Sequence, residues 1–379
     1  MLTIGTFGAA TEPTVSIDGV TITKGVARSS PESVPFVGRE GVVALGGGVE
    51  IPANADFSGG ATVTITNSVI TGNRVAPVKA LPLGPPCPGN RKCPFALAAG
   101  GGIDNWGKLT LRNSTVSHNR VGTASGLSNV ASDAYSGAIM NWRDALTISN
   151  SVIDGNSATA TAPNGRFADS GAIFVEGGAL LMRDSAVTGN RAALAAALPN
   201  SVDLLAIAGG IHISDRAAGT IRDTTISGNQ VSATNTVGNA TAFSGGIHTD
   251  VDFVLSNDII TGNSVRSAAL PGSSGNAQGD SGAGEMGGTI SNTRFTGNSV
   301  TVTGWGGYPH PPSRGHRHGQ LSGRRCRRFS GRRYLRRVNV LQRRERQPCS
   351  RIQPARNRVG PRRRPAGRRR GPDPTEHTR

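Results

Sequence analysis

The feature that most restricts the fold of this chain is a seven-residue motif that recurs seven times. Each copy opens with Asn or Asp, has an apolar residue at its fourth position and closes with Asn. Successive closing asparagines are separated by 34 residues (Asn156 to Asn190) to 46 residues (Asn73 to Asn119), which is typical of stacked repeat proteins. The copies are NSVITGN (67–73), NSTVSHN (113–119), NSVIDGN (150–156), DSAVTGN (184–190), DTTISGN (223–229), NDIITGN (257–263) and NTRFTGN (292–298).

Apolar residues at alternating positions precede each motif. Val63 and Ile65 come before the first copy, and Leu109 and Leu111 come before the second. A period of two predicts a strand with one buried face. Farther upstream, five repeats carry Gly-Gly-Ile or Gly-Ala-Ile. The pattern therefore predicts three short strands per repeat, closed by a variable loop of polar or small residues. The five segments end at Ile103, Ile139, Ile173, Ile211 and Ile247.

Strands this short are stable only when each one pairs with its copies in the neighbouring repeats. Similar repeats stacked in register give an all-β fold, a right-handed, single-stranded parallel β-helix of the pectate-lyase type. About seven to eight rungs are expected, rising by about 4.8 Å each. Because only 4% of the residues are aromatic, the core must be built from Val, Ile, Leu and Ala.

The closing asparagines predict a ladder inside a turn. Stacked side-chain amides can donate and accept along the stack as backbone amides do, and Asn tolerates the left-handed conformation of a sharp turn. The Gly that precedes six of the seven asparagines suits the same turn. Ligand contact by these side chains is the alternative. The column consists of Asn73, Asn119, Asn156, Asn190, Asn229, Asn263 and Asn298.

The Gly-Gly-Ile and Gly-Ala-Ile segments, together with FTGN at 295–298, resemble the GGA[ILV] and FxxN repeats of polymorphic outer membrane proteins. The longer units resemble β-helix repeat regions of bacterial surface proteins. The resemblance spans about residues 45–300, and six of the seven copies have Ile or Val where the family has Phe. It implies a parallel β-helix and a parent protein that lies outside the cell or on its surface.

The formal net charge of +17 belongs to the C-terminal segment alone. Residues 308–379 contain 23 Arg, no Lys and three acidic residues, whereas residues 1–307 contain 18 Lys and Arg against 21 acidic residues. The chain is therefore expected to divide into a β-helix domain (1–307) and a disordered Arg-rich tail (308–379).

The arginine pairs of the tail point to an out-of-frame translation. In GC-rich DNA the codons for Gly-Gly, GGC GGC, become CGG CGG, or Arg-Arg, when the frame slips by one nucleotide. Codons that can encode RRYLRRVNVLQRRERQ (332–347) give GGIYGGSTFSSGESA when they are read one nucleotide later. This shifted sequence contains the Gly-Gly-Ile repeat that is missing from the tail. The alternative is an Arg-rich arm that binds nucleic acid non-specifically through charge.

The rest of the chain gives few signals of targeting or redox state. The sequence contains no run of about 18 apolar residues, so no transmembrane helix is predicted. The first residues carry no visible signal peptide. The segment 14–26 resembles the end of a rung, so we expect a β-helix truncated at its N-terminus, a fragment of a longer protein. Cys87 and Cys93 lie in one Pro-rich insert, where a disulfide and two free thiols are the alternatives.

The residue after each Gly-Gly-Ile or Gly-Ala-Ile segment is expected to face outward. His212 and His248 take this position on successive rungs, and Asp250 lies two residues farther on, so the three could share a metal ion or a proton. The favoured interpretation is that these are exposed, stacked histidines, because two imidazoles are too few to assign a metal. No pair of carboxylates recurs that would predict a glycosidase. The sequence therefore assigns no catalytic residue, metal or cofactor. The column reads Glu50, Asp104, Met140, Phe174, His212 and His248.

These observations favour a non-enzymatic display scaffold of the structural or adhesion type, whose loops bind a host or cell-surface glycan or protein. Two alternatives remain. The first is a carbohydrate-active β-helix, either a polysaccharide lyase or a hydrolase, so the question of enzymatic activity stays open. The second is nucleic-acid binding through the basic tail. The oligomeric state is not indicated by any feature of the sequence.

Overall fold

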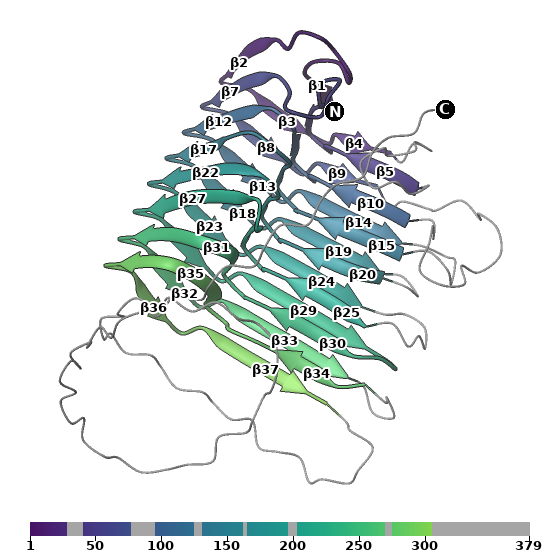
Figure 1. Cartoon of the computed structure of the whole chain (residues 1–379), viewed down its shortest axis with the longest axis vertical. Helices are drawn as coiled ribbons and strands as arrows, with labels where there is room; N and C mark the ends of the chain where they lie inside the picture. Colours follow the sequence, from purple (N-terminus) through teal and green to yellow (C-terminus); the bar gives the residue numbers. More distant parts are fainter. Residues whose placement is uncertain are drawn as a thin grey trace, which may run out of the picture. The chain divides into compact units, whose positions relative to one another are not determined.

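The computed structural model describes residues 1–28, 41–76, 95–124, 131–161, 165–195, 203–269 and 275–304. These residues form β-strands joined by turns and short connections, with no helix among them. The strands stack as successive coils and pair in parallel (Figure 1), and only the isolated bridge between Ala53 and Gly60 is antiparallel. The predicted all-β parallel β-helix is thus confirmed. One of its sheets has eight strands, which gives eight rungs.

Each complete rung passes through four sheets, which we number in the order in which the chain visits them. Sheet 1 has two halves, 1a and 1b, that meet within β31. In sheet 1a the strands are β1 (Leu2–Thr3), β6 (Val49–Ile51), β11 (Ile103–Asn105), β16 (Ile139–Asn141), β21 (Ile173–Val175), β26 (Ile211–Ile213) and the first part of β31 (Ile247–Ser256). In sheet 1b they are β2 (Thr14–Asp18), β7 (Thr62–Thr66), β12 (Lys108–Arg112), β17 (Leu146–Ser149), β22 (Gly178–Arg183), β27 (Ala217–Arg222), the rest of β31, and β35 (Gly284–Ser291), which pairs along β31.

The remaining three sheets follow in the same way. Sheet 2 contains β3 (Thr21–Thr23), β8 (Val69–Thr71), β13 (Thr115–Ser117), β18 (Val152–Asp154), β23 (Ala186–Thr188), β28 (Thr225–Ser227), β32 (Ile259–Thr261) and β36 (Arg294–Thr296). Sheet 3 contains β4 (Val26–Ala27), β9 (Arg74–Val75), β14 (Arg120–Ala124), β19 (Ser157–Thr161), β24 (Arg191–Ala195), β29 (Gln230–Asn235), β33 (Ser264–Ala269) and β37 (Ser299–Thr303). Sheet 4 contains β5 (Gly41–Leu45), β10 (Phe95–Ala99), β15 (Ala131–Tyr135), β20 (Gly165–Asp169), β25 (Leu204–Ile207), β30 (Ala240–Phe243) and β34 (Ala277–Gly279).

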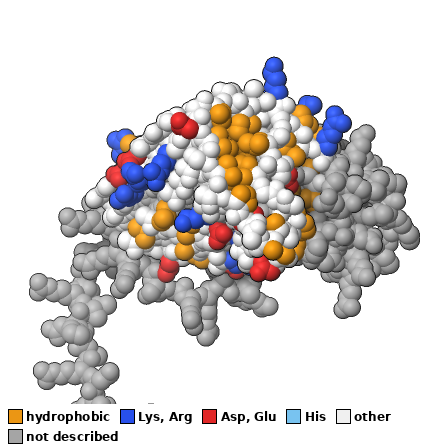
Figure 2. All heavy atoms as spheres, turned by 90° about the horizontal axis from the view of Figure 1, so that it is seen from above, with side chains coloured by type: hydrophobic (Ala, Val, Ile, Leu, Met, Phe, Trp, Pro, Cys, Tyr) orange, Lys and Arg blue, Asp and Glu red, His pale blue; other side chains and the backbone are white. Residues whose placement is uncertain are grey.

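The main core lies between sheets 1 and 2 and consists of aliphatic columns. Ile70, Val116 and Ile153 pair in register on β8, β13 and β18, and all three side chains are fully buried. The alternating residues of sheet 1b, such as Leu109 and Leu111, close the same core. Each such side chain contributes about 1.5 to 3 kcal/mol of hydrophobic free energy. Seen along the stack from its β2 end, hydrophobic side chains gather on the end face (Figure 2), where Ile17 of the first rung is only half-buried.

Sheets 3 and 4 correct the prediction of three strands per rung. Much of the segment expected to be a variable polar or small-residue loop forms two further strands, which pack face to face through a second core of small residues. Ala158 and Ala160 of β19 are fully buried there, as are Ala134 of β15 and Ala168 of β20. Alanine is small enough to let two sheets pack closely, but it gives a weak hydrophobic period in sequence, and the strands were missed for that reason.

The closing asparagines form a continuous ladder of hydrogen bonds. The Nδ2 of Asn119 donates to the Oδ1 of Asn156 at 3.0 Å, and the backbone N–H of Asn119 donates to the same oxygen at 2.9 Å. A second Nδ2 proton of Asn119 is donated to the Ile70 carbonyl on the preceding rung. The same arrangement recurs from Asn73 to Asn298, so these buried amides are satisfied within the stack.

The sequence suggested that the closing Asn adopts the left-handed conformation of this turn, but other residues adopt it. Positive φ angles occur at the residue before the closing Asn, for example 60° at Gly155 and 53° at His118. They also occur at the Asn or Asp that opens each motif, for example 49° at Asn150. The closing Asn keeps an ordinary backbone conformation, and its side chain reaches the next rung from there.

The first Gly of the Gly-Gly-Ile and Gly-Ala-Ile segments occupies a point of close backbone approach. At Gly171, a Cβ atom would overlap the carbonyl oxygen of Gly209 on the next rung and the backbone nitrogen of Arg191 in sheet 3. The residue before it, Ser170, has φ of 52° and turns the chain out of sheet 4. This turn brings the end of each sheet 4 strand over the outer face of sheet 1a, which creates the site described next.

Candidate functional site

The column expected to face solvent on sheet 1a is in fact buried in its central rungs. Met140 and Asp104 are fully buried, and His212 and His248 are 5% and 8% exposed. The outward side chains of sheet 4 cover this face, as Tyr135 does when it stacks on Phe174 with ring centroids 5.6 Å apart. The interpretation of the histidines as exposed residues is therefore wrong, because the sheet 3 and sheet 4 layer had not been foreseen.

His212 on β26 is held on both of its ring nitrogens. Its Nδ1 lies 2.7 Å from Oδ2 of Asp169, a carboxylate that is 1% exposed and that accepts a hydrogen bond from the Ser170 hydroxyl. Its Nε2 lies 3.2 Å from Oδ2 of Asp250. The ring is also stacked on Phe174, with centroids 4.6 Å apart and an interplanar angle of 13°. The orientation of this imidazole is thus fixed by its packing as well as by its hydrogen bonds.

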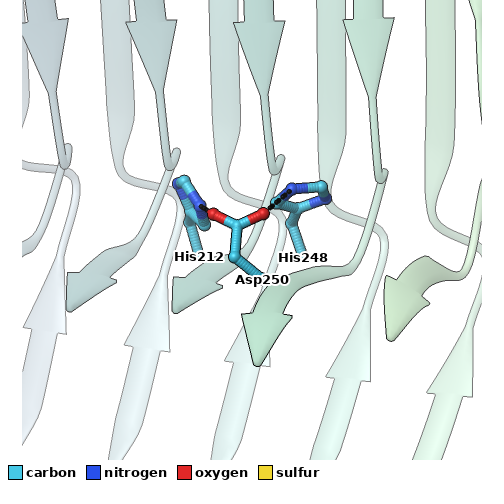
Figure 3. A group of neighbouring side chains, drawn as sticks. All are labelled: His212, His248 and Asp250. Atoms are coloured by element: carbon cyan, nitrogen blue, oxygen red, sulfur yellow. Dashed lines mark hydrogen bonds and ion pairs between the residues drawn. The ribbon is translucent and has the colours of Figure 1, made fainter. Parts of the chain in front are cut away.

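His248 pairs with His212 across β26 and β31, so the two rings are about one strand spacing apart. The Nε2 of His248 lies 3.2 Å from Oδ1 of Asp250, and its Nδ1 lies 3.1 Å from the Ser244 hydroxyl. The Asp250 carboxylate therefore bridges the two imidazoles, as Figure 3 shows. One donor atom from each of His212, His248 and Asp250 lies within 4.8 Å of the other two.

The charges around this cluster shift the pKa values of two of its members. Burial alone lowers the pKa of His212, but the charge and hydrogen bond of Asp169, with those of Asp250, raise it to about 9. The hydrogen bonds from His212 and His248 hold the pKa of Asp250 well below its usual range. In the absence of a bound metal ion, His212 therefore holds its proton at neutral pH.

Ser244, His248 and Asp250 have the composition of a hydrolase triad, but their geometry differs from a working one. Ser244 is fully buried, and its oxygen already accepts the backbone N–H of Glu285 at 3.0 Å. A nucleophile needs access to the substrate and a base that can take its proton. The Ser244 hydroxyl is therefore suited to orienting the imidazole of His248. The groups that are open to chemistry are Nε2 of His248 and the carboxylate of Asp250, whose side chain is 44% exposed.

A second buried carboxyl lies three rungs away on the same face. Asp104 on β11 is fully buried, and its Oδ1 accepts a hydrogen bond of 2.9 Å from Nε1 of Trp142, which stacks on Trp106. Burial raises the pKa of Asp104 well above its usual range, despite the hydrogen bond from Trp142. Because the group is enclosed by aromatic rings, it lacks the solvent access that catalysis requires.

Sequence reasoning did not identify Asp169, Ser244 or the role of Glu285 in this cluster. Asp169 is the last residue of β20, and Ser244 directly follows the last residue of β30, so both belong to the part of the repeat for which the sequence predicts a loop. Glu285 lies in β35, with Oε2 3.8 Å from Nδ1 of His248. An acidic residue immediately before Ser-Gly-Ala-Ile was the one signal in the sequence that could have found Asp169.

Several predicted features lie outside the described residues. They are the Cys87 and Cys93 pair and the Arg-rich segment 308–379. The predictions made for them remain predictions. Within the described residues, no helix has the length and apolar character needed to cross a bilayer.

Comparison of this chain with protein-family models, with curated proteins and with solved structures gave no match.

Proposed function

We propose that this chain is a non-enzymatic display scaffold, which holds variable connections at one edge of a rigid β-helix for the binding of a glycan or protein. The observation that carries the proposal is where the repeats differ in length. The turn from sheet 4 to sheet 1a keeps three residues in six rungs, for example 100–102, 136–138 and 170–172. The connection from sheet 3 to sheet 4, in contrast, ranges from 162–164 in one rung to 76–94 in another.

This difference has a simple physical basis. The sheet 4 turn brings backbones of neighbouring rungs into close contact, so an inserted residue there would disturb this packing. The sheet 3 to sheet 4 connection joins two strand ends, and lengthening it costs only a slowly growing closure entropy. Because β14, β19 and β24 stack in register, with Ala124 paired to Thr161 and Thr161 paired to Ala195, the connections that follow them start from the same edge. Variable segments on a rigid scaffold are the usual arrangement for recognition.

We further propose that the parent protein is secreted or attached to a bacterial surface, in keeping with the resemblance of its repeats. Display of this kind requires an edge of the β-helix that a partner can reach. It does not require an enclosed cavity, and the exterior can be polar. The enzyme alternative would require an accessible pair of reactive groups. Among the described residues, the buried Asp104 and Ser244 do not meet that requirement, and the accessible groups of His248 and Asp250 are hydrogen-bonded to each other.

The experiment is an exchange of connections within the full chain. Residues 77–94 are replaced by the short segment 162–164, and a matched variant shortens 196–203 in the same way. Binding to immobilised acidic and neutral polysaccharides and to purified surface proteins is measured at high salt, which suppresses attraction to the Arg-rich tail. We expect binding that falls at least tenfold in one exchanged variant while thermal unfolding is unchanged. Release of reducing ends or unsaturated sugars would overturn the proposal in favour of an enzyme.

A further inference from the structure

The His212, His248 and Asp250 cluster has the geometry of a small metal site. In the hydrogen-bonded arrangement, Nε2 of His212 is 3.2 Å from Oδ2 of Asp250, and Nε2 of His248 is 3.2 Å from Oδ1 of the same carboxylate. Three ligands bound to one ion at about 2.0 to 2.2 Å lie about 3 to 3.5 Å from one another. The three donor atoms already fall within 4.8 Å, so a small inward movement of the side chains would place them around a common centre.

The surroundings of the two imidazoles support the same assignment. A ligating histidine usually donates its other ring N–H to a carboxylate or another acceptor, which fixes the orientation of the ring. Asp169 provides this contact to Nδ1 of His212 at 2.7 Å and is itself fixed by Ser170. The hydroxyl of Ser244 lies 3.1 Å from Nδ1 of His248. Both contacts leave Nε2 directed toward Asp250.

The local charge favours a cation. Asp169 and Asp250 contact the rings directly, Glu285 lies 3.8 Å from His248, and Glu176 is close enough to interact electrostatically with His212. Arg216 pairs with Glu176 at 3.2 Å and is largely exposed. Carboxylates therefore outnumber the cationic groups around the two rings, and a divalent ion between them would compensate the excess negative charge.

The site also has an opening to solvent. The two imidazoles are nearly buried, but the side chain of Asp250 is 44% exposed. An ion bound by these three residues would thus keep one coordination position accessible to water. Two imidazole nitrogens with one carboxylate oxygen suit zinc and the neighbouring transition metals, whereas Ca²⁺ and Mg²⁺ prefer sites made entirely of oxygen.

We propose that His212, His248 and Asp250 bind one divalent transition-metal ion of the zinc type, through Nε2 of both histidines and one carboxylate oxygen of Asp250. Asp169 is a positioning residue for His212. The ion links the sixth and seventh rungs from outside the core, because its ligands lie on β26 and β31. This inference does not depend on the display function proposed above.

The first test is metal binding to the full chain. The protein is stripped with a chelator, and Zn²⁺ is then added in a calorimetric titration, while Co²⁺ is followed by its visible absorption. The starting protein carries His310→Ala, His316→Ala, His318→Ala and His377→Ala, because the histidines of the C-terminal segment could bind zinc themselves. We expect one ion per chain and a cobalt spectrum without thiolate-to-metal absorption, which excludes the cysteines as ligands.

Matched variants then assign the site. We expect His248→Ala and Asp250→Asn each to weaken Zn²⁺ binding by about 100-fold or more, and Asp169→Asn to weaken it by about 10- to 100-fold. His118→Ala, at an exposed turn in sheet 2, should leave the affinity unchanged. Circular dichroism checks the fold of each variant. If His248→Ala does not fold, the more exposed Asp250 still provides the test through Asp250→Asn. Unchanged affinity in Asp250→Asn, or no binding by the starting protein, would overturn the proposal.

Discussion

The Nδ2 of Asn119 donates a hydrogen bond of 3.0 Å to the Oδ1 of Asn156, which is 37 residues later in the chain and directly adjacent in the stack. Neither side chain is accessible to more than a trace of solvent, with exposed fractions of 0% and 1%. The free energy of a buried amide depends on whether its partners are present, so the ladder is sensitive to a single substitution.

We expect Asn156→Ala to lower the free energy of unfolding by about 2 to 4 kcal/mol. The substitution leaves two donors of Asn119, its N–H and its Nδ2, without their acceptor in a buried environment. Chemical denaturation monitored by circular dichroism measures the loss. Thr159→Ala, in the strand that follows, is the control and should change stability by less than about 1 kcal/mol. Equal losses in the two variants would contradict a special role for the ladder.

Asp258 stands where the other motifs have Ser or Thr, and we expect Asp258→Ser to stabilise the protein at neutral pH. Burial raises the pKa of Asp258 to about 6, although the backbone N–H groups of Thr224 and Ser256 favour its ionised form. A raised carboxyl pKa means that the folded state binds a proton that the unfolded state has released, so stability falls as pH rises from about 4 to 6.

The measurement is the melting temperature of the two proteins as a function of pH. Asp258→Ser should melt a few degrees higher at pH 7.5, and the difference should shrink toward pH 4, where the folded protein carries a neutral Asp258. A serine can still accept the Thr224 N–H, as Ser151 accepts the corresponding N–H of Ser114. A pH-independent difference would show that packing, not ionisation, separates the two variants.

The second core depends on small side chains, so we expect Ala192→Leu to be destabilising. Ala192 on β24 is fully buried among other alanines between sheets 3 and 4. Adding three carbon atoms to a packed layer of this kind costs about 1 to 3 kcal/mol. Ala195→Leu, at an exposed position of the same strand, is the matched control. Thermal unfolding of both variants should separate the effect of packing from that of strand propensity.

Gly171→Ala tests the close approach in the sheet 4 turn. A methyl group there would overlap backbone atoms of Gly209 and Arg191, and backbone cannot rotate away as a side chain can. We expect a loss of about 3 kcal/mol or a failure to fold. Gly122→Ala is the control, because a Cβ at that position meets no atom within 4 Å. Comparable stability in the two variants, measured by denaturation, would argue against the close contact.

The strands around the main core could be predicted because their apolar residues alternate with polar ones. Ile70, Val116 and Ile153 all occupy the fourth position of the repeated motif, which is enough to predict the strands of sheet 2. Their in-register pairing follows because the repeats are similar. Sheets 3 and 4 were not predictable in the same way. A strand such as Ser157–Thr161, with sequence SATAT, has little contrast between its two faces until it meets a partner of the same kind.

The candidate site shows the same limit. His212 and His248 could be placed side by side from the repeat, and Asp250 lies two residues from the second histidine. Their burial and the contact with Asp169 depend on sheet 4, which brings residues of another strand over the outer face of sheet 1a. A single sequence records the columns along the stack, but it carries almost no signal for contacts between different sheets.

The asparagine ladder also has a consequence for how such a chain can change over generations. Every asparagine from Asn119 to Asn263 uses the same atoms to meet the coil on either side of it, so at this turn each coil presents the same hydrogen-bonding groups to its neighbours. Removing or duplicating one whole coil would rejoin matching groups at this turn. We therefore expect unequal recombination that adds or removes an entire coil to preserve the ladder while the protein changes its length.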